Sequence, residues 1–312
     1  MTSNVKRAIS SDLLLRNSFS GMSEITSKST RLMDSAAFGH YKPLGPPARF
    51  FGDEVVVVRH SETIAEVFGD WVQLSKMDDN FYFPFDLNVP VQIPRRPNMV
   101  KSYQADPPLS EMGKITAQLI ARELRERGAT PNYVYCAPDL ASLETASAIQ
   151  KFLGSRCGKL RVEPELSTLH GSSHVFFDKN SLSELGYQLD PTYEPLRKIN
   201  APLSATQVVS NIRRAFFEVT NTEKLVLIVT DSLATRIISS VVEGSNYMIS
   251  GSLENQREAA TAMFPPLSSL VAFKENGPGR RTFEESDVLL RPLTSIGGSN
   301  DIVIPESTLY AK

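Results

Sequence analysis

The stretch that decides the fold is residues 55–62, which reads VVVVRHSE. Four consecutive β-branched residues form a short apolar run, which is typical of a strand buried on both faces of a sheet. The run ends at two polar side chains, Arg59 and His60. We therefore predict a buried strand over 55–58, with Arg59 and His60 at its carboxyl end.

Outward from this stretch, strand-like and helix-like segments alternate along the chain. The predicted strands are 133–136, 160–162, 225–229 and 270–273, and the predicted helices are 110–127, 143–153, 204–219 and 232–242. Ser110 and Gly128 stand where the N-cap and the C′ glycine of the first long helix belong. Such alternation predicts a three-layer α/β/α domain with a mainly parallel sheet, in which ligands bind at the carboxyl ends of the strands.

An insertion rich in aromatic residues and prolines, residues 69–108, follows the first strand. Its length favours a functional or capping loop over a simple connection. Three interpretations stay open for its aromatic cluster: a small core that holds the insertion down, a wall that stacks on a ligand, or a subunit contact. The cluster consists of Trp71, Phe81, Tyr82, Phe83 and Phe85.

Composition excludes several classes of protein. The 312 residues are 41% hydrophobic and 22% charged, and the net charge of −2 argues against a general attraction to nucleic acid or to an anionic membrane. A membrane span needs about 20 apolar residues, and the longest apolar runs are far shorter. Without a secretory apolar segment, we expect a cytoplasmic protein whose two cysteines, Cys136 and Cys157, are reduced thiols.

The chain is predicted to contain one folded domain, residues 51–300. Residues 1–50 are rich in serine and mildly basic, which is typical of a disordered tail. That tail is either a plain solvated segment or a site of phosphorylation or partner docking. Residues 301–312 are assigned to a C-terminal tail.

An ordered set of motifs resembles a known family. The set begins with Arg59-His60 and comprises the segments 106–110, 140–146, 161–164 and 228–230, then 67–69, 86–90 and 94–96 in the insertion, and 292–300. Over about residues 52–300 the chain resembles the histidine phosphatase superfamily, also called phosphoglycerate mutase-like. The insertion is similar to that of one branch, which contains the phosphatase domains of the suppressors of T-cell receptor signalling and the ecdysteroid-phosphate phosphatases.

The resemblance implies a phosphohistidine mechanism with His60 as nucleophile and Arg59 as a phosphate-binding cation. The family also uses two further arginines, a glutamate as acid and a second histidine. At those four positions this chain has Thr63, Ala141, Thr168 and Asp231. Glu165 lies three residues before the acid's position, so we do not expect it to point into the same site.

The expected loss of rate and the expected repulsion of phosphate both favour a pseudophosphatase. Loss of a general acid alone lowers a rate by about 10²–10⁴. A carboxylate about 4 Å from a phosphate repels it by about 4 kcal/mol at an effective dielectric constant of 20. We therefore expect a degenerate phosphatase-like protein that acts by binding an unknown protein partner. The alternative is a weak or non-standard phosphomonoester or phosphotyrosine phosphatase that uses Arg59 and His60, helped by Arg95, Arg96 or an acid of the substrate.

Three further expectations concern contacts and ligands. Arg59 is predicted to pair with Asp231 across the pocket, unless it binds an anion, and His60 either traps phosphate or is retained for its packing. His170 and His174 are interpreted as loop histidines without a third ligand, so neither a metal nor a cofactor is expected. The resemblance also implies a homodimer.

Overall fold

A computed structural model describes residues 50, 53–169, 176–198, 202–276, 281–285, 290, 291 and 293, all within the second of the chain's two units, Ala48–Lys312. Within this part of the chain, a six-stranded sheet has the order β3-β2-β4-β1-β5-β6. Its strands are β1 (Glu54–Arg59), β2 (Tyr133–Cys136), β3 (Leu160–Val162), β4 (Val226–Thr230), β5 (Ser269–Asn276) and β6 (Arg281–Glu285).

Neighbouring strands from β3 through β1 run parallel, whereas β5 and β6 are antiparallel to their neighbours. In the centre of the sheet, Val58 of β1 is opposite Val229 of β4, and Arg59 is opposite Thr230. The carboxyl ends of β1 and β4 therefore lie side by side, which brings the segments after Arg59 and after Thr230 together. The mainly parallel sheet agrees with the prediction from the sequence.

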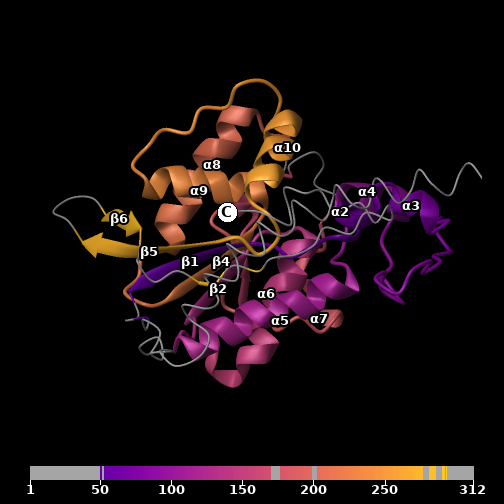
Figure 1. Ribbon diagram of the computed structural model, residues 1–312, viewed down its shortest axis with the longest axis horizontal. Helices are drawn as coiled ribbons and strands as arrows, with labels where there is room; N and C mark the ends of the chain where they lie inside the picture. Colours follow the sequence, from indigo (N-terminus) through magenta and orange to yellow (C-terminus); the bar gives the residue numbers. More distant parts are fainter. Residues whose placement is uncertain are drawn as a thin grey trace, which may run out of the picture. The chain divides into compact units, whose positions relative to one another are not determined.

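Helices cover both faces of this sheet (Figure 1). One face is covered by α8 (Ala205–Val219), α9 (Ser232–Val242) and α10 (Leu253–Met263), and the other by α5 (Glu111–Glu126), α6 (Leu140–Leu153) and α7 (Lys179–Glu184). Two single 3₁₀ turns, Gly154–Arg156 and Pro164–Leu166, flank β3. The architecture is the predicted three-layer α/β/α.

The four valines of β1 explain why this strand is central. Val55 and Val57 pack with the cluster under α8 and α9, whereas Val56 and Val58 pack with the cluster under α5 and α6. Because successive strand side chains point to opposite faces, a strand between two helical layers needs apolar residues at every position. All six residues of β1 are buried.

Local sequence signals hold the start of α5 against the loop that follows β1. The Ser110 hydroxyl accepts a hydrogen bond from the Gly113 amide, as predicted for an N-cap, and Gly128 has the positive φ of 74° expected after the helix. At Gly113, an added Cβ would lie 2.2 Å from the Glu62 carbonyl oxygen. Only glycine therefore allows α5 to approach the segment that carries His60.

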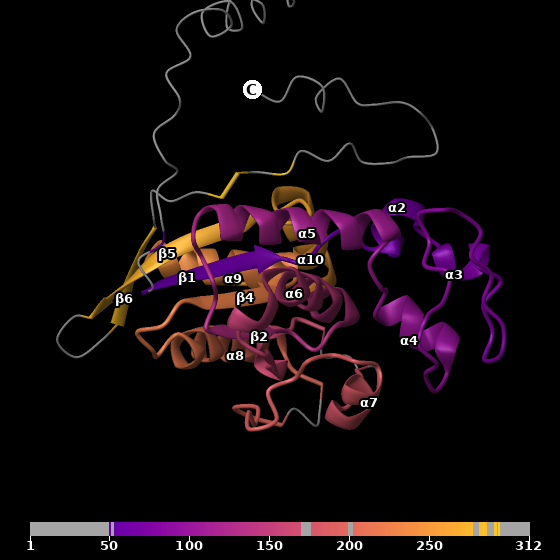
Figure 2. The ribbon, with the colours of Figure 1, turned by 90° about the horizontal axis from the view of Figure 1, so that it is seen from below.

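The insertion has a small core of its own around α2 (Ile64–Phe68), α3 (Trp71–Leu74) and α4 (Met99–Ala105). Trp71 is buried and contacts Tyr103 edge to face, with ring centroids 5.9 Å apart. Phe81 and Phe83, by contrast, are about half exposed. The small-core interpretation therefore holds for part of the aromatic cluster only. Figure 2 shows that the arrow of β1 points toward these three helices.

Six helices and strands in the described part of the chain were not predicted from the sequence: the short helices α2, α3, α4 and α7, and also α10 and β6. β6 is an edge strand whose segment, RTFEE, is mostly charged, and charged side chains are typical of exposed edges. α10 has one fully buried residue, Ala260, so its apolar spacing is weak. No helix among the described residues is long and apolar enough to cross a membrane. The predicted tails 1–50 and 301–312, apart from Phe50, and the pair His170 and His174 lie outside the described residues.

Candidate functional site

A pocket of about 240 Å³ lies at the carboxyl ends of β1 and β4. This is the edge at which parallel α/β sheets bind ligands. The structure brings together in its wall all six positions that the resemblance singled out: Arg59, His60, Thr63, Ala141, Thr168 and Asp231.

His60 has the protonation state that a nucleophilic histidine needs. Its Nδ1 lies 2.8 Å from the Ser61 carbonyl oxygen, and because a carbonyl only accepts hydrogen bonds, Nδ1 carries the proton. Nε2 is then left with a lone pair. Burial, followed by the charge of Arg59, lowers the pKa of His60 to about 3, so the imidazole is neutral near pH 7.

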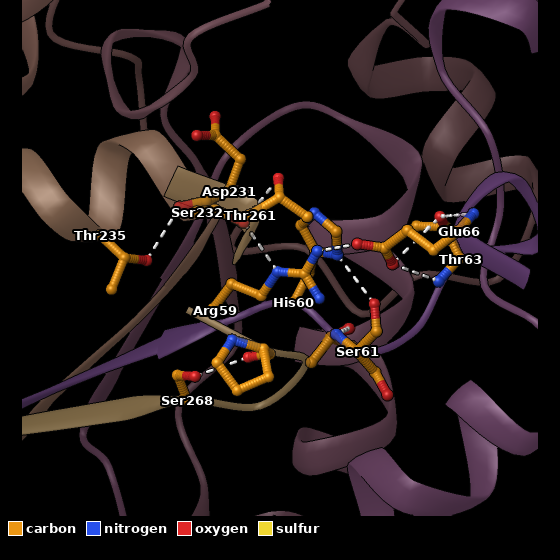
Figure 3. A network of polar contacts seen from close by, with 12 residues as sticks. Arg59, His60, Ser61, Thr63, Glu66, Asp231, Ser232, Thr235, Thr261 and Ser268 are labelled. Carbon is orange, nitrogen blue, oxygen red and sulfur yellow. Dashed lines mark hydrogen bonds and ion pairs between the residues drawn. The ribbon is translucent and has the colours of Figure 1, made fainter. Parts of the chain in front are cut away.

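Arg59 is held by two partners in the depth of the pocket. The side chain is 1% exposed, its Nε donates to the Ser232 hydroxyl over 3.0 Å, and its Nη2 forms an ion pair with Glu66 (Figure 3). Nη1 is buried and has no hydrogen-bond partner among the described residues. Burial lowers the pKa of Arg59 to about 10, against the opposing effect of nearby carboxylates, so the guanidinium remains charged.

The predicted ion pair between Arg59 and Asp231 is wrong. Among the described residues, the carboxylate that pairs with Arg59 is Glu66, and Figure 3 shows the Asp231 carboxylate pointing away from the guanidinium. The physical reason is that the Asp231 carboxylate already binds other donors. Its negative charge still acts on Arg59 from a distance and is the largest charge effect that raises the pKa of Arg59.

Asp231 is the N-cap of α9 and also holds Thr168. One carboxylate oxygen accepts from the Ala234 amide over 2.9 Å, and the other accepts from the amide and the hydroxyl of Thr168 over 3.0 and 2.8 Å. Two positions at which this chain departs from the family pattern are thus hydrogen-bonded to each other. In this structure they serve as a structural link between the segment after β3 and the start of α9.

Thr63 has likewise a structural contact in place of a phosphate contact. Its hydroxyl caps α2 by accepting from the Glu66 amide over 3.2 Å, while a Glu66 carboxylate oxygen accepts from the Thr63 amide over 2.8 Å. This reciprocal pair is a capping box. It places the Glu66 carboxylate beside Arg59.

Arg257 is a second cation in the pocket wall, which the sequence did not reveal. It comes from α10, and its guanidinium donates to the hydroxyl and the carbonyl oxygen of Thr168. The N-cap at Ser252 was the local signal for this helix, since its apolar spacing is weak. No local signal could have shown that Arg257 contacts Thr168, which lies 89 residues earlier in the sequence.

Asp139 is a buried acid that was also missed, although it lies between the inspected positions after β2. Its side chain is 2% exposed, and Oδ2 has no hydrogen-bond partner among the described residues. Burial raises the pKa of Asp139 well above its usual range because the carboxylate loses its contact with water, and the negative charges of Asp106 and Asp231 act in the same direction. The signal was a carboxylate directly after the predicted strand 133–136.

The proposed auxiliary cations are not part of the pocket wall. Arg96 is buried in an ion pair with Asp106, at 2.6 Å, and its guanidinium lies over the Tyr103 ring. Arg95 is exposed. Arg96 is therefore neither a free cation of the pocket nor a solvated surface residue, because it is buried in an ion pair with Asp106.

Glu165, as expected, points elsewhere: it is fully buried and pairs with Arg214 of α8. In the described part of the chain, no group of three or more His, Cys, Asp or Glu side chains is placed to hold a metal ion.

Acidic and basic side chains are matched in the pocket wall. Arg59 and Arg257 face Glu66 and Asp231, while Asp106 is compensated by Arg96 behind it. His60 is neutral, and the raised pKa of Asp139 favours its uncharged form. The pocket therefore offers little net attraction to a phosphate dianion.

Comparisons with known proteins bear on the fold and on the predicted resemblance. The chain is 33% identical over 148 residues to the mouse Ubiquitin-associated and SH3 domain-containing protein A, covering 45% of the chain and 24% of that protein. It is 30% identical over 149 residues to the Ecdysteroid-phosphate phosphatase of Drosophila melanogaster, covering 46% of the chain and 20% of that protein. The matched region thus spans a quarter or less of these relatives, and no family model matches the chain.

Among solved structures, the ecdysone phosphate phosphatase of Bombyx mori in complex with tungstate superposes with a TM-score of 0.61, at 21% identity, over 79% of this chain and 95% of that one. The chain thus shares the fold of that phosphatase. In sequence it resembles the branch of the histidine phosphatase superfamily that its motifs predicted, because its relatives include a Ubiquitin-associated and SH3 domain-containing protein and an ecdysteroid-phosphate phosphatase.

Proposed function

We propose that this protein is a catalytically degenerate histidine phosphatase-like module, which acts by binding rather than by turnover. One observation supports the proposal: Arg59, the cation beside His60, is ion-paired with a carboxylate of the chain itself. Glu66 pairs with Arg59, and Asp231 lies in the same wall as Arg257. A phosphoryl-transfer site instead needs a surplus of positive charge where charge develops.

The missing groups support the same conclusion. Thr63 and Ala141 place no cation in the pocket, and Thr168 cannot act as a carboxylic acid. Removal of one donor to the transition state typically lowers a rate by about 10²–10³. Since residues of one site act together, such losses do not simply multiply, but one of them already removes most turnover.

Hydrolysis tests this proposal directly. We expect the purified wild-type protein to hydrolyse an aryl phosphate and phosphotyrosine peptides no faster than the His60→Ala variant. The variant is the matched control because it removes the nucleophile without changing the net charge of the neutral pocket. A wild-type rate clearly above that of His60→Ala would contradict the proposal.

A second candidate function, weak or non-standard phosphatase activity, is favoured by one specific observation. The neutral His60 has its Nε2 lone pair available, and Asp139 supplies a carboxyl whose protonated form is favoured in the same pocket. A nucleophile and a proton donor are the two groups that the family mechanism combines. In this alternative, Asp139 replaces the acid that Thr168 lacks.

The two candidates separate by a second variant. If the wild type is active, the Asp139→Asn variant and the His60→Ala variant should each lose that activity, whereas the Asp70→Asn variant should keep it. Asp70 is a suitable control because it is also an N-cap aspartate without a side-chain cap, but it is exposed. Activity that survives Asp139→Asn would remove the acid from this scheme.

The partner that the binding function requires is proposed to be a protein, and a homodimer is proposed beside it. The exposed apolar side chains of the insertion support a protein contact, since Leu87 is 98% and Val91 is 75% exposed. Pull-down with 51–300 and 1–50 as separate baits would test which part carries the partner. Capture by neither bait would contradict a stable protein complex.

A further inference from the structure

We infer that Glu66 occupies an anion subsite on Arg59 and is thereby the residue that excludes small oxyanions from the pocket; the inference rests on the proposed function. Glu66 belongs to no position that the family resemblance assigned. Its carboxylate takes the place on the guanidinium that an oxyanion of a ligand would otherwise take.

The contacts of Glu66 are those of a bound oxyanion. One carboxylate oxygen accepts from Arg59 Nη2, and the other accepts from the amide of Thr63 over 2.8 Å and from its hydroxyl over 3.2 Å. A guanidinium, a backbone amide and a hydroxyl are groups that proteins use to bind phosphate oxygens. Both residues line the pocket, and the Glu66 side chain is one quarter exposed whereas Arg59 is buried, so Glu66 is the solvent-accessible member of the ion pair.

What remains around Arg59 shows that the subsite could accept a ligand. Arg59 Nη1 is buried and has no hydrogen-bond partner within the described ranges, and Ser232 and His60 line the same cavity. A protonated phosphate oxygen could donate to the free Nε2 of His60, because Nδ1 already carries that ring's proton. The cavity of about 240 Å³ suits a small tetrahedral oxyanion.

Neutralising Glu66 should therefore convert the pocket into an anion site. Without the Glu66 carboxylate, Arg59 loses its ion-pair partner and keeps only the more distant charges of acidic residues such as Asp231. A buried cation without a contacting anion attracts an oxyanion ligand at low effective dielectric constant. Glu66→Gln keeps the shape of the side chain and an oxygen that can accept from the Thr63 amide. At Arg59 it replaces the charged acceptor oxygen by an NH2 group, so both the negative charge and the hydrogen-bond acceptor that face the guanidinium are lost.

The matched control is Glu62→Gln. Glu62 lies four residues earlier, acts on Arg59 only through its charge at a distance, and accepts its hydrogen bond from Ser110 over 2.6 Å outside the pocket wall. Both variants change the net charge of the chain by the same amount. A difference between them therefore reports contact with Arg59 and excludes a general charge effect.

The experiment is a calorimetric titration of the full chain with inorganic phosphate at pH 7. We expect Glu66→Gln to bind phosphate at least tenfold more tightly than wild type and Glu62→Gln, a difference of about 1.4 kcal/mol. Adding Arg59→Gln to Glu66→Gln should abolish the gain. A folded Glu66→Gln variant that binds phosphate no better than Glu62→Gln would overturn the inference.

Two further measurements keep the test decisive. If Glu66→Gln does not fold, Glu66→Ala takes its place. The second measurement is an NMR titration of the wild type with phosphate, in which the chemical shifts of the His60 ring should not follow a saturable binding curve. Saturable wild-type binding of phosphate at His60 would overturn the inference without any variant. The hydrolysis assay is separate: turnover by the wild type refutes the proposed function, whereas phosphate affinity of the variants judges Glu66.

Discussion

Among single residues of the pocket, two have pKa values that are shifted so as to favour the uncharged form of the side chain. His60 has a lowered pKa and Asp139 a raised one, and burial is the first cause of both. Each shift links the stability of the fold to pH, because the folded and unfolded chains then bind different numbers of protons. The two residues act in opposite directions, so variants distinguish them.

Asp139→Asn should stabilise the protein at pH 7. The folded pKa of Asp139 lies above its unfolded value, so the folded chain binds an extra proton between those two values and loses stability as the pH rises through them. The amide removes this penalty, and we expect a higher free energy of unfolding in urea at pH 7 but little change near pH 3. Asp70→Asn is the exposed control. A destabilised Asp139→Asn variant at pH 7 would mean that the ionised carboxylate is stabilised in the folded state.

His60→Gln should flatten the acid limb of the stability curve. The folded pKa of about 3 lies below the unfolded value of about 6.5, so between these pH values only the unfolded chain is protonated and stability falls as the pH falls. One such proton contributes at most about 1.4 kcal/mol per pH unit. Urea unfolding at pH 4, 5, 6 and 7 measures the slope. Parallel curves for wild type and variant would show that His60 titrates normally.

At the scale of elements, the starts of α2 and α9 carry the departures from the family pattern. Thr63 caps α2, and Asp231 caps α9 and binds Thr168. Residues that would hold phosphate in an active relative hold helix ends here. Restoring the family residues would therefore also remove caps, so we expect the fourfold change Thr63→Arg, Ala141→Arg, Thr168→Glu and Asp231→His to lower the melting temperature.

A double-mutant cycle on Asp231 and Thr168 tests this link. Loss of an N-cap alone costs about 0.5–2 kcal/mol, and Ser204→Ala at the exposed start of α8 measures that baseline. Asp231→Ala should cost more than Ser204→Ala, because two hydrogen bonds from Thr168 are lost with it. We expect a coupling free energy with Thr168→Val of about 0.5–3 kcal/mol. Additive effects of the two substitutions would show that the pair is not coupled.

At the scale of the whole molecule, assembly is the open prediction. A homodimer is expected from the resemblance, and large apolar side chains stand exposed on the insertion and on α5, among them Met112 and Ile115. Light scattering at micromolar concentration should report about twice the 34.5 kDa mass of the chain. The Met112→Lys substitution is expected to weaken a dimer that uses this surface. A monomeric wild-type protein would contradict the prediction of a homodimer.

Much of the fold followed from local pattern. The strands at 133–136 and 160–162 and the helix 232–242 agree with their predicted bounds, because apolar period and caps are properties of neighbouring residues. The elements β6 and α10 were missed because an edge strand and a mostly exposed helix bury few side chains. Their sequence pattern is correspondingly faint.

For the pocket, the strand pattern predicted that the segments after β1 and β4 lie at a common edge of the sheet. The resemblance then predicted which further positions belong there, and Arg59, His60 and the four replaced residues do line one pocket. Tertiary structure alone decided the partners within that wall. Arg59 pairs with Glu66 instead of Asp231, and Arg257 reaches Thr168 from α10. The physical reason is that a charged side chain pairs with whichever donors or acceptors lie close to it in the folded structure. Those distances, and the competing hydrogen bonds of each candidate partner, cannot be inferred from spacing along the chain.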